Sequence, residues 1–141
     1  VEQNMRLNLE LKPCAGRARA TVMVTLIELT QIWPEKAPPP LISSFDVEAL
    51  TMAANLHPEW PRGLLLDHWD ENWNDLLRAT NAQTIHLQES CLTEYRVGIL
   101  KNAGFPVLAY VVNDPARAKT LLQWGVSAVL SDDPELILKS L

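Results

Sequence analysis

A carboxylate and an ammonium group lie two residues apart near the start of the chain, where together they could bind a metal ion and a phosphate. Glu10 and Lys12 alternate with Leu9 and Leu11, and this period of two predicts a β-strand over residues 7–13. Strand geometry places Glu10 and Lys12 on one face, roughly 7 Å apart, with the leucines on the other face. An ordinary surface ion pair has the same pattern and contributes little to stability. The two residues alone therefore leave both interpretations open.

Strand-like and helix-like segments alternate along the whole chain. Strands are expected at residues 7–13, 40–45, 63–67, 84–87, 106–113 and 128–131. Helices are expected at residues 20–33, 46–55, 73–79, 93–103, 115–123 and 134–141. This repetition is typical of a parallel sheet. Because no strand is followed by a glycine-rich phosphate-binding motif, a (β/α)-barrel is favoured over a nucleotide-binding doubly wound sheet. In a barrel, the functional residues lie at the carboxyl ends of the strands.

Helix boundaries are marked by residues that commonly cap helices. Asp46 and Asp114 are of a residue type that commonly caps the start of a helix. Pro115 follows Asp114, and proline is favoured at the first helical position. Gly104 and Gly125 follow two predicted helices, where a left-handed residue commonly ends the helix. These signals agree with the six-fold strand and helix repeat.

Several short motifs near the expected strand ends occur in a characteristic order. They are Asn-Leu-Glu-Leu-Lys-Pro at 8–13, Leu-Ile-Ser-Ser-Phe at 41–45, Arg-Gly-Leu-Leu-Leu-Asp at 62–67, Ile-His-Leu at 85–87, Leu-Lys-Asn-Ala-Gly at 100–104, Ala-Tyr-Val-Val-Asn at 109–113, Trp-Gly-Val-Ser-Ala at 124–128 and Ser-Asp-Asp-Pro at 131–134. Together they resemble the C-terminal half of the glycerophosphodiester phosphodiesterase family, especially its short cytoplasmic bacterial enzymes. The resemblance implies an α/β fold, a (β/α)8 TIM barrel of the phosphodiesterase type, present here as an incomplete barrel of about six βα units.

The resemblance also implies a function. Members of the family hydrolyse glycerophosphodiesters to glycerol 3-phosphate and an alcohol such as choline or ethanolamine, with a divalent metal, usually calcium or magnesium, and two histidines as general acid and base. Glu10 matches a metal ligand of the family and Lys12 matches a contact to the substrate phosphate. A hard cation prefers carboxylate oxygens, and a lysine adds positive charge where phosphoryl transfer accumulates negative charge. Tyr110 and Asn113 end the fifth strand, so they are expected to bind substrate.

The chain departs from the family in one large respect. The His-Arg-Gly strand end, the Pro-Glu-Asn-Thr loop, the acidic strand and the His-Asp pair of the family are absent, and His57, His68 and His86 have no matching context. Residues 1–141 are therefore expected to be the C-terminal portion of one barrel domain, with ~100 residues upstream that carry the first strands and the catalytic histidines. The residues before Leu7 are expected to end a helix. By this interpretation the chain is inactive alone.

Other interpretations remain open. The chain could be a non-catalytic barrel fragment or relic in which Glu10 and Lys12 form an ion pair, or a related phosphodiesterase of the phosphatidylinositol-phospholipase or sphingomyelinase D type. A second metal site formed by Asp67, His68 and Asp70 is a weaker hypothesis. His86 is expected to be an inward-facing histidine with satisfied hydrogen bonds, with catalysis as the weaker alternative.

Aromatic residues gather near the third strand. Trp60, Trp69 and Trp73 are expected to form a hydrophobic wall after this strand, partly packed and partly facing substrate.

Composition excludes several classes of protein. A hydrophobic fraction of 48% and a charged fraction of 21% are ordinary for a packed domain. A net charge of −5 argues against a nucleic-acid partner. No apolar run reaches the ~20 residues that span a bilayer, and no signal peptide is visible. Two cysteines, Cys14 and Cys91, have no metal-type spacing, so reduced thiols in a cytoplasmic protein are expected. The expected partner is a small-molecule glycerophosphodiester.

Overall fold

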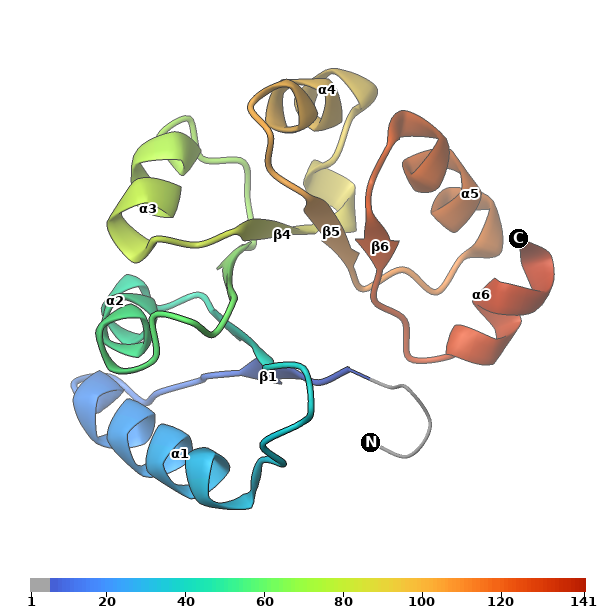
Figure 1. The fold of residues 1–141 in the computed structure, drawn as a ribbon. Coiled ribbons are helices and arrows are strands. Elements are labelled where there is room, and N and C mark those ends of the chain that lie inside the picture. Colours follow the sequence, from blue (N-terminus) through green and yellow to red (C-terminus); the bar gives the residue numbers. More distant parts are fainter. Residues whose placement is uncertain (1–5) are drawn as a thin grey trace. The chain divides into compact units, whose positions relative to one another are not determined.

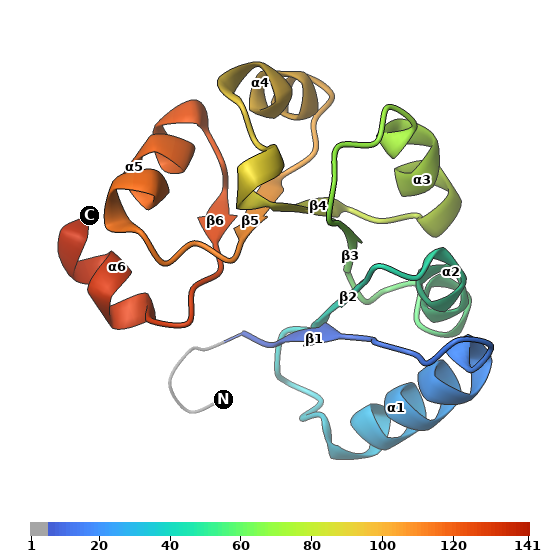
Figure 2. The same ribbon diagram turned by 180° about the vertical axis from the view of Figure 1, so that it is seen from behind.

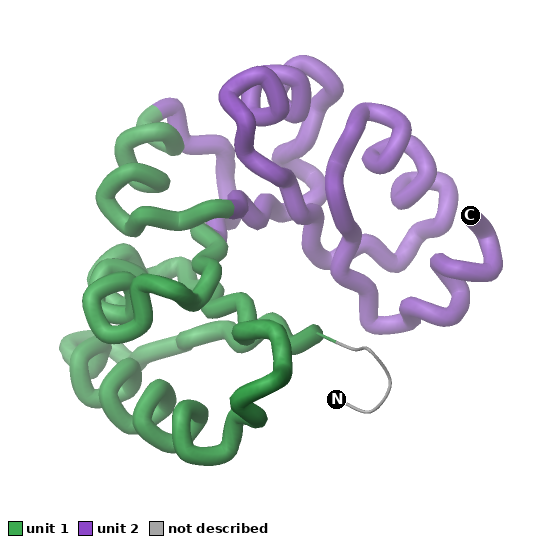
Figure 3. The backbone as a smooth tube through the Cα atoms, viewed as in Figure 1, with its two compact units in different colours: residues 1–64, 72–83 green, residues 65–71, 84–141 purple. Residues whose placement is uncertain are grey.

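Six strands alternate with six α-helices in the computed structural model, which describes residues 6–141 (Figure 1). The expected end of a helix before Leu7 falls largely on residues 1–5, outside the described residues. The chain divides into two compact units, residues 1–64 with 72–83 and residues 65–71 with 84–141 (Figure 3). Each unit is described below by itself.

Unit 1 is a parallel arrangement of strands in chain order, with its helices on one side (Figure 2). Its elements are β1 (Asn8–Glu10), α1 (Ala18–Ile32), β2 (Leu41–Ser44), α2 (Val47–Leu56), the start of β3 (Arg62–Leu66) and α3 (Trp73–Thr80). The register pairs Glu10 with Ser43, and Ser43 with Gly63. Consecutive order with helices on one side is the arrangement of a barrel and not of a doubly wound sheet.

The core of unit 1 lies between β1, β2 and the helices α1 and α2. Its buried members come from α1, β2 and α2, from the residue after β1 and from the loop after α2: Leu11, Val22, Leu26, Leu29, Ile42, Ala49, Ala53 and Trp60. Leu9 packs against this cluster, as the alternation of β1 predicts. Trp60 is only 8% exposed, so its expected place in an aromatic wall after the third strand is wrong. A buried tryptophan before β3 extends the helix-side core instead.

Unit 2 repeats the pattern. Its elements are β4 (Thr84–Gln88), the 3-10 turn η1 (Glu89–Cys91), α4 (Glu94–Asn102), β5 (Val107–Tyr110), α5 (Pro115–Trp124), β6 (Ala128–Val129) and α6 (Pro134–Ser140). The parallel register pairs His86 with Leu108 and Gln88 with Tyr110. Because partners in a parallel register share a face, His86 and Tyr110 lie on one face of these strands, opposite Ile85 and Leu87.

Local signals place the helix ends as the sequence predicts. The Asp46 carboxylate accepts from Ala49 N at 2.9 Å and the Asp114 carboxylate accepts from Ala116 N at 2.9 Å. Gly104 and Gly125 have φ angles of 86° and 99°, the left-handed conformation that ends a helix. Four of the six strands, β1, β2, β5 and β6, are shorter than expected. The pattern over residues 7–13 gives a strand only at Asn8–Glu10, although Leu11 N still donates to Ser43 O at 2.7 Å.

Candidate active site

Glu10 and Lys12 lie at the carboxyl end of β1, on the face opposite Leu9 and Leu11. Both charged side chains are exposed, whereas Leu11 is only 2% exposed. Within residues 6–141, neither Glu10 nor Lys12 takes part in an ion pair or a side-chain hydrogen bond. The ion pair expected for a relic is therefore not formed between these residues. Both charges are available to a ligand.

Lys12 borders a surface hollow of about 330 Å3 between the ends of β1 and β2. Its other lining residues are Leu11, Pro13, Ser44, Phe45 and Asp46.

Hydrogen bonds fix the walls of this hollow. The Ser44 hydroxyl donates to Leu11 O at 2.5 Å and accepts from Asp46 N at 3.0 Å, so the ends of the two strands are tied together. The Asp46 carboxylate is held by the first turn of α2, where it stabilises the helix. Lys12 thus stands beside a rigid concave surface.

Tyr110 and Asn113, at the end of β5, both use polar atoms to hold the fold of unit 2. The Tyr110 hydroxyl donates to Leu66 O at 2.8 Å. Asn113 Oδ1 accepts from Ser131 Oγ and from Asp132 N, each at 2.9 Å, and Asn113 Nδ2 donates to Asp132 Oδ2 at 2.9 Å. Asn113 therefore fixes the loop between β6 and α6. Substrate binding by Tyr110 and Asn113 stays a prediction.

The loop after β3 is ordered by contacts within unit 2. The Asp67 carboxylate lies 2.5 Å from His68 Nδ1, and Trp69 Nε1 donates to Glu71 Oε1 at 2.8 Å. The guanidinium of Arg96 lies 5.0 Å from the centre of the Trp69 ring, a cation–π contact. Among the described residues, no three His, Cys, Asp or Glu side chains are grouped as a metal site requires. The hypothesis of a metal site at Asp67, His68 and Asp70 is wrong for this structure.

His86 is fully buried on β4, as expected, but its hydrogen bonds are not all satisfied. Nε2 lies 3.0 Å from Thr84 Oγ1, whereas Nδ1 has no partner in the described part of the chain. Burial lowers the pKa of His86 from 6.5 to about 4. The ring is therefore neutral near pH 7, because protonation would place a charge in an apolar interior.

His57 has a structural role that the sequence did not reveal. Its ring stacks on Trp60 with centroids 4.2 Å apart, its Nδ1 lies 3.0 Å from Glu59 Oε1, and its Nε2 lies 3.2 Å from Thr30 Oγ1. The hydrogen bond with His57 lowers the pKa of Glu59. The contact with Thr30 spans 27 residues, so no local pattern could have indicated it.

A model of the glycerophosphoryl diester phosphodiesterase family matches residues 1–136. The chain belongs to this family. No curated protein sequence gives a significant match. No helix within the described residues is both long enough and apolar enough to cross a membrane.

Solved structures agree with the family assignment. A phosphodiesterase from Oleispira antarctica in complex with the product sn-glycerol-3-phosphate has 36% sequence identity and a TM-score of 0.93, covering 99% of this chain and 56% of that chain. A Silicibacter pomeroyi protein assigned to the family has 22% identity and a TM-score of 0.83, covering 99% of this chain and 50% of that one. A Parabacteroides distasonis glycerophosphodiester phosphodiesterase has 19% identity and a TM-score of 0.78, covering 97% of this chain and 57% of that one.

These structures confirm the expected fold class. The α/β arrangement of parallel strands alternating with helices matches about half of each phosphodiesterase structure. At identities near 20%, the second and third likenesses show the fold alone. The chain spans about half the length of the structures it matches.

Proposed function

We propose that this chain is part of a divalent-metal-dependent phosphodiesterase that hydrolyses glycerophosphodiesters to glycerol 3-phosphate and an alcohol. Membership of the family supports this proposal, as does the sn-glycerol-3-phosphate bound to the Oleispira antarctica relative. The observation that carries it is the pair Glu10 and Lys12, exposed on one face at the end of β1, with neither charge neutralised by another residue of the described part.

Lys12 is proposed to bind the phosphate of the substrate. An ammonium group is a compact point charge with three donors, and it suits a phosphate oxygen. Its position beside the hollow at the ends of β1 and β2 leaves room for the glycerol part of the ligand. Because negative charge gathers on the phosphoryl oxygens during transfer, a fixed positive charge stabilises the transition state.

Glu10 is proposed as one metal ligand. Calcium takes six to eight oxygen ligands and magnesium takes six, some of them water. The described residues offer a single carboxylate at the end of β1 and no grouped set of three ligands, so by themselves they do not fit a calcium or magnesium site. We therefore assign no chemical step to a metal within this chain. Glu10 is proposed to complete a site whose other ligands come from elsewhere in the whole protein.

Tyr110 and Asn113 are proposed to contact the substrate, because they lie at the carboxyl end of β5. Tyr110 ends β5 and Asn113 follows it, and the Asn113 amide has a second N–H beyond the one that it donates to Asp132. The substrate is a small molecule, and the proposed location is the cytoplasm, where Cys14 and Cys91, both without a disulfide partner, would stay reduced.

Binding of sn-glycerol 3-phosphate to the 141-residue chain tests the proposed role of Lys12. Ligand-observed NMR should detect weak binding that is lost in Lys12→Met and kept in Lys36→Met, which removes an exposed lysine from the loop before β2. Equal binding by the wild type and Lys12→Met would remove Lys12 from the site.

A further titration tests Glu10. Addition of calcium or magnesium should strengthen the binding of sn-glycerol 3-phosphate only in the whole protein. Glu10→Ala should abolish that gain and Glu35→Ala, at another exposed glutamate, should keep it.

A further inference from the structure

Helix α1 has large apolar residues on its outer surface as well as on its inner one. The inner surface buries Ala18, Val22, Leu26 and Leu29. On the outside, Val24 is 64% exposed, Ile27 is 49% exposed and Ile32 is 74% exposed. An ordinary surface helix has polar residues on its outer face, whereas a helix that is apolar all round is normally covered all round. The outer face of α1 therefore has the composition of a contact surface.

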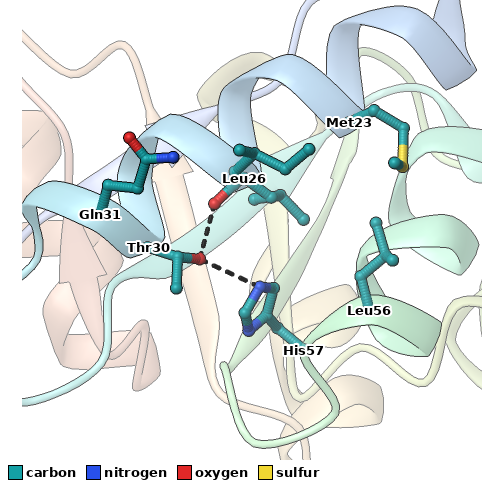
Figure 4. A pocket seen from close by; sticks show the side chains of 7 residues that line it. Met23, Leu26, Thr30, Gln31, Leu56 and His57 are labelled. Atoms are coloured by element: carbon teal, nitrogen blue, oxygen red, sulfur yellow. Dashed lines mark hydrogen bonds between the residues drawn. The ribbon is translucent and has the colours of Figure 1, made fainter.

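A hollow of about 320 Å3 lies beside these side chains, between α1 and the end of α2 (Figure 4). It is lined by Met23, Leu26, Ile27, Thr30, Gln31, Leu56 and His57.

Thr30 and His57, two of the three polar side chains that line this hollow, already form contacts at one end of it. The Thr30 hydroxyl donates to Leu26 O at 2.6 Å and lies 3.2 Å from His57 Nε2. Met23 and Leu56 line the other end (Figure 4). The hollow therefore offers mainly apolar contact, which suits an inserted aliphatic side chain.

Charges at the two ends of this outer face have opposite signs. Arg17 precedes α1 and Glu28 lies near its end, both exposed. Their spacing is close to three full turns, so they lie on one strip of the helix, ~16 Å apart along its axis. A basic residue at the start of a helix and an acidic residue near its end oppose the helix dipole. Neither residue forms an ion pair with another described residue. Helix stability does not explain these charges.

We propose that the outer face of α1, with the hollow beside it, binds the same face of a second copy of this chain in antiparallel orientation. A two-fold axis across α1 brings Arg17 of one copy to Glu28 of the other, and the reverse, so both charges gain a partner. Val24 lies close to this axis, so the Val24 side chains of the two copies lie near each other, and Ile27 flanks them on the same outer face. The contact uses residues of unit 1 only and does not depend on the proposed catalytic function.

Sedimentation analysis of the 141-residue chain tests the dimer. The wild type should show a species of twice the 15.8 kDa monomer mass that dissociates on dilution. Val24→Glu should abolish this species, because it places a charge in the apolar centre of the contact. The control Tyr95→Glu, at a residue of α4 that is 78% exposed, should leave it unchanged. Circular dichroism should show that each variant is folded, as expected for changes at exposed positions.

Charge reversal separates this contact from non-specific association. Arg17→Glu should weaken the dimer by about tenfold or more, since it creates like charges in the contact. The double variant Arg17→Glu with Glu28→Arg should recover wild-type association. A monomeric wild type at all concentrations would overturn the proposal, and so would association that survives both Val24→Glu and Arg17→Glu. A double variant that fails to recover would overturn the antiparallel arrangement.

Discussion

The stability of this chain should fall as pH decreases from about 6.5 toward about 4 because of His86. In the folded state burial lowers the pKa of His86 from 6.5 to about 4. Above pH 6.5 the ring is neutral in both the folded and unfolded states, so it causes no pH dependence. Between the two pKa values the unfolded state binds a proton that the folded state does not, so the free energy of unfolding decreases as pH falls. Below about pH 4 His86 is charged in both the folded and the unfolded state, so its protonation causes no further loss of stability.

The magnitude follows from the size of the shift. Each unit of pKa difference is worth about 1.4 kcal/mol, so the shift of His86 corresponds to about 3 kcal/mol of stability lost between neutral and acidic pH. This is a large share of the stability of a small domain. The surroundings of His86 support a lowered pKa, because the side chain is fully buried and, within residues 6–141, only Thr84 Oγ1 lies within hydrogen-bonding distance of its ring. No carboxylate that could stabilise an imidazolium pairs with His86 among the described residues.

Urea unfolding followed by tryptophan fluorescence, at pH values from about 7.5 to about 4, measures the effect. His86→Leu should be within about 1 kcal/mol of the wild type near pH 7, because the variant also removes a buried nitrogen that has no partner. Toward pH 4 it should be more stable than the wild type by about 3 kcal/mol. His68→Gln, which removes an exposed histidine, should keep the wild-type pH dependence. Parallel pH profiles for the wild type and His86→Leu would refute the reasoning.

Three further outcomes are expected. The 141-residue chain alone should not release glycerol 3-phosphate from glycerophosphocholine or glycerophosphoethanolamine with calcium, magnesium or manganese, in a coupled dehydrogenase assay; release that vanishes in Glu10→Ala would contradict this. Arg62→Met should lower the free energy of unfolding, measured in urea, by about 2–4 kcal/mol. The buried guanidinium of Arg62 donates to the carbonyls of His57, Pro58, Trp60 and Asn81. Arg78→Met, at an exposed arginine, is the control. Gly125→Ala should cost about 1–2 kcal/mol, because φ is +99° and the new methyl meets the Lys101 side chain, whereas Gly98→Ala, with open space around it, should be neutral or stabilising.

Periodicity and capping residues predicted the fold well because they depend on neighbours in the chain. The alternation of Leu9 and Leu11 with Glu10 and Lys12 determined which side chains are buried. Asp46 and Asp114 begin helices through bonds to backbone groups two or three residues away. The lengths of β1, β2, β5 and β6 were overestimated, because a strand-like pattern continues past the point where a partner strand offers hydrogen bonds.

Periodicity and capping residues could not predict contacts between residues that lie far apart in the chain. Tyr110 has the position of a residue that lines a pocket, yet its hydroxyl is bound to a carbonyl 44 residues away. Asn113 likewise uses its amide to hold a loop 18 or 19 residues further along the chain. The position of Trp60 was predicted wrongly, because the hydrophobicity of a side chain indicates that it is buried but not which residues it packs against. A position at the end of a strand therefore predicts the region in which a side chain lies, but it does not predict which groups that side chain contacts.

Some charged side chains of this chain stabilise the fold, whereas those at the end of β1 do not. Arg117 donates to Glu89 Oε2 at 2.7 Å and to the carbonyls of Glu89 and Leu92, so that pair fixes the turn after β4. Glu10 and Lys12 have no such neighbours and fix nothing in the described part of the chain. An exposed ion pair between them would have contributed less than about 1 kcal/mol, so leaving them apart costs the fold little. In a chain of net charge −5, Lys12 is a positive charge that forms no ion pair with a described residue, as its proposed contact to a phosphate requires.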